Sequence, residues 1–96
     1  MITANGGMLL QIFDRLEALV HAEDASAAAR EARLLLAEID RRGSEIISAA
    51  VDDLLIDMLT LAFVAEAFEG GALEATRRLA QKRLSKIKLL SVVLPA

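Results

Sequence analysis

The most apolar stretch, Ile46 to Phe68, constrains this chain most, because a helix over it is apolar on nearly every side from Leu54 to Phe68. Ala, Leu, Glu, Arg and Lys dominate the sequence, and all five are good helix formers. A helix that is apolar all round is normally surrounded by other elements. A length of 96 residues allows one domain. We therefore expect an all-α fold, a four-helix bundle with a long central third helix, as a single domain over residues 1–96.

Capping residues and glycines divide the chain into four expected helices. Asp24 or Ser26 is suited to cap the second helix, and Ser44 is suited to cap the third. Gly43 is a plausible residue just beyond the second helix, and Gly70-Gly71 predicts a tight turn between the last two. Apolar residues at helical spacing complete the assignment. The expected helices span residues 8–23, 24–42, 44–69 and 72–94, after a flexible tail over residues 1–7.

The expected helices carry more apolar surface than one copy of the chain covers easily. Three amphipathic helices must surround one that is apolar on every side, and a chain of this size buries only about two-thirds of its unfolded surface. Large exposed apolar patches usually mark an interface. We therefore expect a homodimer, with a compact monomeric bundle as the alternative. The expected apolar contact residues for the second copy or a partner are Leu55, Met58, Leu59, Phe63, Leu90, Val93 and Leu94.

Charge is segregated along the chain. Residues 1–71 contain thirteen acidic and five basic residues, and residues 72–96 contain one acidic and six basic residues. Arg83 falls near the apolar side of the last helix, so we expect it to form a partly buried ion pair with Asp52, Asp53 or Asp57. The other bases lie opposite the apolar side and form the expected partner-binding face: Arg77, Arg78, Lys82, Lys86 and Lys88.

This basic face has three candidate roles. It either pairs with carboxylates of its own domain, binds an acidic partner protein, or meets the phosphates of nucleic acid or anionic lipid. The acidic remainder of the chain repels phosphate at low salt, which disfavours nucleic acid. The three aromatic residues are all phenylalanines, which offers little for stacking single-stranded bases.

Residues that support catalysis are scarce. The chain has no Cys and one His, His21, which excludes a thiolate zinc site and a site with several histidines. Asp53 and Asp57 are four residues apart and suit a divalent cation only if other ligands converge on them. The Gly pairs lack the Lys-Ser/Thr of a phosphate-binding loop. We expect a non-enzymatic protein with no catalytic residue, cofactor or metal, and a metal-dependent carboxylate enzyme is a weaker alternative.

The membrane is not an expected partner. The segment over residues 46–68 is long enough to cross a bilayer, but it contains Asp52, Asp53, Asp57 and Glu66. A carboxylate at membrane depth costs about 2.5–3.5 kcal/mol or more. The N-terminus lacks the basic region and apolar run of a secretory signal. We therefore expect a soluble, cytoplasmic protein.

Two stretches of the sequence resemble the mannitol operon repressor family. The first runs from Arg42 to Leu55 and contains Ala49-Ala50 and Asp52-Asp53, and the second is the stretch from Leu84 to Leu89. This resemblance implies an all-helical fold and a role in transcriptional control, exerted through a protein partner. Together with the charge pattern it predicts a small regulatory, adaptor or inhibitor protein, of bacterial or phage type, that binds proteins. The alternative is a DNA-binding repressor that uses the basic C-terminal helix.

Overall fold

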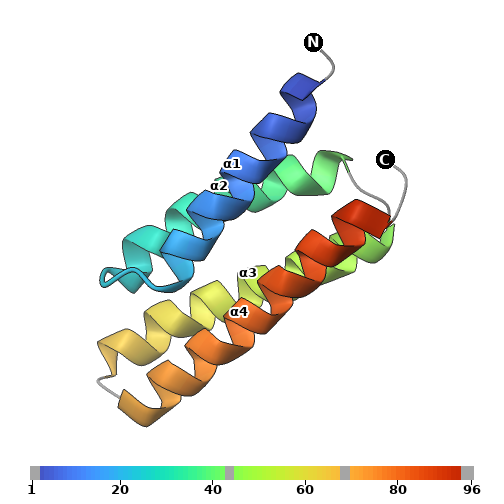
Figure 1. Ribbon diagram of the computed structural model, residues 1–96. Helices are drawn as coiled ribbons and strands as arrows, with labels where there is room; N and C mark the ends of the chain where they lie inside the picture. The colour runs from blue at the N-terminus through green and yellow to red at the C-terminus, as the bar shows by residue number, and fades with distance from the viewer. Residues whose placement is uncertain (1–2, 43–44, 68–69, 94–96) are drawn as a thin grey trace.

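The computed structural model describes residues 3–42, 45–67 and 70–93, and nearly all of them are helical (Figure 1). This part of the chain contains no strand, so the predicted all-α bundle is confirmed. The four helices are α1 (Thr3–Val20), α2 (Ala25–Arg42), α3 (Glu45–Glu66) and α4 (Gly70–Val93).

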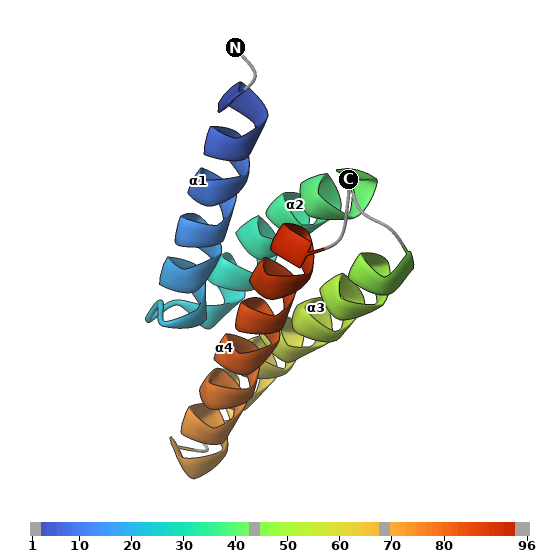
Figure 2. The ribbon, with the colours of Figure 1, turned by 45° about the vertical axis from the view of Figure 1, so that its right-hand side comes forward.

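The helices pack in a ring in which each helix packs mainly against two others. The most extensive packing joins α3 to α4 and α2 to α3, and α1 closes the ring with smaller contacts to α2 and α4. Figures 1 and 2 show α3 and α4 running side by side in opposite directions, with α1 and α2 laid over one end of that pair. The molecule is accordingly elongated, with extents of 45, 22 and 17 Å. Large apolar side chains on the outer sides of this pair remain exposed, among them Phe63 of α3 and Leu89 of α4.

Local sequence signals place one boundary well. The Asp24 side chain accepts a hydrogen bond of 3.0 Å from the backbone N–H of Ala27, which makes Asp24 the N-cap of α2 as predicted. The preceding helix ends in two tightened turns, because the N–H groups of His21 and Ala22 bond to the carbonyl oxygens of residues 18 and 19. The expected cap Ser44 and the expected C-terminal Gly43 lie outside the described residues.

Several boundaries differ from the prediction, among them the end of the first helix, which lies at Val20 and not at residue 23. The first helix begins at Thr3, so residues 3–7 are helical and do not form the expected tail. Each residue that extends an existing helix gains one hydrogen bond as its backbone is fixed. Starting a helix fixes several residues for a single hydrogen bond and is therefore far less favourable. Gly70 and Gly71 begin α4 and do not lie in a turn before it, so α4, with 24 residues, is longer than α3, with 22.

The core lies between the helices and is built from aliphatic side chains. Small residues of α2 are buried at Ala28, Ala29 and Ala32, which lets this helix approach its neighbours closely. The same core includes Leu84 and Ile87 of α4, neither of which has any solvent exposure. The largest fully buried side chains are Leu16, Val20, Leu36, Ile39, Leu54, Met58, Leu61, Leu84 and Ile87.

Candidate functional site

The outer side of α3 carries a short exposed apolar stripe. Ile56, Leu59 and Phe63 are 59%, 53% and 71% exposed. Their spacing of three and four residues places all three on one face of the helix. We call these three residues the α3 stripe. Asp52 and Glu66, which are also exposed, follow at either end and give the stripe a charged boundary.

The opposite side of α3 faces the core. Met58 is 1% exposed, so the prediction that it contacts a second copy or a partner is wrong. Leu55 and Leu90 are half-buried and pack against the core. Leu59 and Phe63 are the two predicted contact residues that lie fully at the surface. The Val93 side chain and Leu94 lie outside the described part of the structure.

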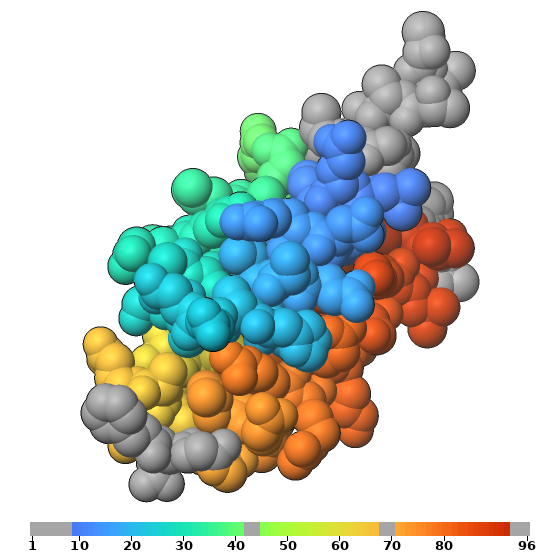
Figure 3. Space-filling model, turned by 60° about the vertical axis from the view of Figure 1, so that its left-hand side comes forward, coloured from blue at the N-terminus to red at the C-terminus, as the bar shows by residue number. Residues whose placement is uncertain are grey.

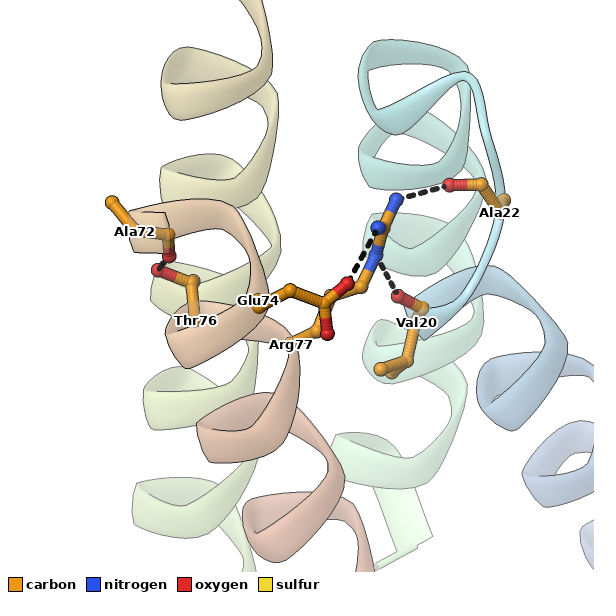
Figure 4. A network of polar contacts seen from close by, with 6 residues as sticks. All are labelled: Val20, Ala22, Ala72, Glu74, Thr76 and Arg77. Atoms are coloured by element: carbon orange, nitrogen blue, oxygen red, sulfur yellow. Dashed lines mark hydrogen bonds and ion pairs between the residues drawn. The ribbon is translucent and has the colours of Figure 1, made fainter. Parts of the chain in front are cut away.

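Arg77 does not belong to the solvent-facing basic surface. Its Nε and Nη2 groups donate hydrogen bonds of 3.2 and 2.9 Å to the backbone carbonyls of Val20 and Ala22, at the C-terminal end of α1 (Figure 4). Its remaining guanidinium nitrogen lies 3.8 Å from Glu74. Arg77 therefore caps α1 from a neighbouring helix, as cations at a helix C-terminus do, and is occupied within the fold.

Lys88 and Arg83 also find partners within the domain. Lys88 lies 3.4 Å from a carboxylate oxygen of Glu17 on α1, and the space-filling view shows α1 side chains directly against α4 (Figure 3). Arg83 lies 3.1 Å from Asp53 and 2.6 Å from Asp57, both on α3. The predicted ion pair of Arg83 is thus confirmed, and it involves two of the three expected acids. The third, Asp52, is exposed.

Asp57 is the buried member of this cluster. Its side chain is 7% exposed, whereas that of Arg83 is 33% exposed. Burial raises the pKa of Asp57, Arg83 opposes that rise, and the negative charge of Asp53 adds to it. The cluster links α3 to α4 as a structural ion pair. No group of three or more acidic, His or Cys side chains in the described residues is placed to hold a metal ion.

Two further polar contacts hold α1 in place. The Arg15 guanidinium donates two hydrogen bonds, of 2.6 and 2.8 Å, to the Glu31 carboxylate on α2, and this lowers the pKa of Glu31. The ring of His21 lies 3.1 Å from the side-chain oxygen of Gln81 on α4. These contacts are exposed, and they hold α1 against α2 and α4.

The remaining three bases of α4 form a separate exposed row. Arg78, Lys82 and Lys86 are all exposed, and no described acidic residue lies within ion-pair distance of them. They are four residues apart and therefore share one side of the helix. We call these residues the α4 row. The structure thus divides the six bases of α4 into three that hold the fold together and three that face solvent.

No described helix is long and apolar enough to cross a membrane. Comparisons with protein-family models, with curated proteins and with solved structures found no match to this chain. The similarity to the mannitol operon repressor family therefore stays a prediction. The α3 stripe and the α4 row are two exposed surfaces available to a partner.

Proposed function

We propose that this chain is a small non-enzymatic regulatory or adaptor protein that acts by binding proteins and pairs with a second copy of itself. The observation that carries the proposal is the α3 stripe. Three large apolar side chains at helix-packing spacing face solvent from the most apolar helix of the fold. An apolar centre with a charged rim is the usual composition of a protein interface.

A second copy is the simplest occupant of this surface, because a two-fold contact uses the same patch on both chains. Two copies bring six large side chains together, each contributing about 1.5 kcal/mol when its exposed part is buried. Association costs at least about 4 kcal/mol in lost freedom of motion. The difference corresponds to a weak, reversible dimer with a dissociation constant on the order of 100 μM.

Phe63→Glu is expected to weaken self-association by about tenfold or more, because it places a buried unpaired charge within the contact, at the most exposed residue of the stripe. The matched control is Leu34→Glu, at an exposed leucine of α2 outside the stripe. Sedimentation equilibrium of both variants and of the native chain makes the comparison, with circular dichroism to verify folding. Equal dissociation constants for the native chain and Phe63→Glu would contradict the assignment of this face.

A further inference from the structure

We propose that the α4 row, Arg78, Lys82 and Lys86, is a docking site for an acidic amphipathic helix of a partner protein. This inference takes from the proposed function only the idea that the ligand is a protein. It concerns a different helix from the α3 stripe, and the two surfaces are tested by different variants.

The α4 row differs from the other three bases of α4 in its contacts within the fold. Arg77, Arg83 and Lys88 each contact a carboxylate or carbonyl oxygen of α1, α3 or α4 itself. The α4 row lacks such contacts with any described residue. Like charges four residues apart repel each other, so this row weakens the helix and does not stabilise it. A complementary row of carboxylates from outside would remove that repulsion.

The length and spacing of the α4 row match those of a second helix. Three cations over eight residues extend about 12 Å along the helix. Carboxylates at the same four-residue spacing on a second helix match this length. Leu79 and Leu89 are exposed on the same outer side of α4, three residues before Lys82 and three residues after Lys86. Apolar side chains beside the cations favour a ligand that carries leucine-like and acidic residues together, which describes an amphipathic helix.

Carboxylates beside α4 favour a narrow ligand, such as a helix, over a wider polyanion. The contact between Lys88 and Glu17 places an α1 carboxylate beside α4, and the contact between Arg83 and Asp53 places an α3 carboxylate beside it as well. Both carboxylates are about half exposed. A helix of about 10 Å diameter lying along the row avoids them. A flat anionic bilayer or a DNA duplex is wider than the row and brings further phosphates toward the rest of the chain. There the thirteen acidic residues of segment 1–71 outnumber its five basic residues and repel the phosphates.

The probe is a synthetic capped peptide of about 20 residues, with Glu at three positions four apart and Leu beside them on the same helical face. Binding is followed by nuclear magnetic resonance of the isotope-labelled chain. We expect shift changes centred on residues 78–89 and affinity that falls as salt rises. Arg78→Glu/Lys82→Glu is expected to weaken binding by about tenfold or more. The control Arg30→Glu/Arg33→Glu changes the net charge equally at exposed arginines of α2 and is expected to leave affinity within about twofold.

Three outcomes would overturn the proposal. The first is the absence of shift changes over residues 78–89. The second is an equal loss of affinity in both double variants, which would mean that only net charge matters. The third is binding of duplex DNA or phosphatidylserine vesicles through the row without binding of the peptide. Phe63→Glu is expected to bind the peptide normally, so failure of the dimer and failure of this docking site are distinguishable.

Discussion

Replacing Leu84 with alanine is expected to lower the free energy of unfolding by about 2–5 kcal/mol. Leu84 is fully buried on α4, in the core between the helices. Shortening it removes packed apolar surface and leaves a cavity that the surrounding helices only partly close. A domain of this size has a total stability of about 5–15 kcal/mol, so the variant is expected to lose a large share of it. Urea unfolding followed by circular dichroism measures the change.

The same substitution at an exposed position separates core packing from helix propensity. Leu34→Ala replaces a leucine of α2 that is largely in solvent. We expect its free energy of unfolding to stay within about 0.5 kcal/mol of the native value. Similar losses for Leu34→Ala and Leu84→Ala would contradict the placement of the core.

Replacing Arg83 with methionine is expected to destabilise the fold by about 2–4 kcal/mol near about pH 7. Methionine keeps the aliphatic stem but removes the cation, which leaves the buried Asp57 without a counterion. The expected loss is smaller than that for a fully buried ion pair, because a third of the Arg83 side chain is exposed. Arg78→Met makes the same change in the α4 row and is expected to have little effect on unfolding.

The loss in Arg83→Met is expected to depend on pH. Burial holds the pKa of Asp57 above that of an unfolded aspartate, so its protonated form suits the fold. The stability linked to this group is present below about pH 4 and is lost as pH rises through the folded pKa. Arg83 limits that rise in pKa, so its removal makes the loss larger. The free energies of unfolding of the native protein and Arg83→Met are expected to differ little at about pH 4 and most at about pH 7.

A difference between native protein and Arg83→Met that is constant over this range would contradict the role given to Asp57. The double variant Asp57→Leu/Arg83→Met removes both charges together. We expect it to recover most of the lost stability, because a well-packed apolar pair often replaces a buried ion pair without cost. Recovery is measured by the same urea unfolding.

The sequence predicted features that depend on neighbouring residues. Asp24 caps α2 because its side chain and the N–H of Ala27 lie within one turn of each other. Arg83 was predicted to be partly buried because it falls at the edge of the apolar side of its own helix. Both features can be predicted because each depends on residues of one helix or its first turn.

Other features depend on how the helices pack against each other, and the pattern of a single helix does not predict them. The third helix is apolar nearly all round, so its pattern did not show that Met58 faces the core while Leu59 faces solvent. Arg77 was expected at the surface with the other bases. It turns inward because the fold brings the carbonyl groups at the end of α1 within its reach. Asp57 is buried because α4 packs against α3 and places Arg83 beside it.

The dependence of molar mass on concentration measures whether the exposed side of α3 pairs with a second copy. Sedimentation equilibrium of the unmodified chain is expected to give the monomer mass of 10.3 kDa when dilute. The mass is expected to rise toward twice that value as the concentration approaches about 500 μM. A mass that stays at the monomer value over this range would contradict the account.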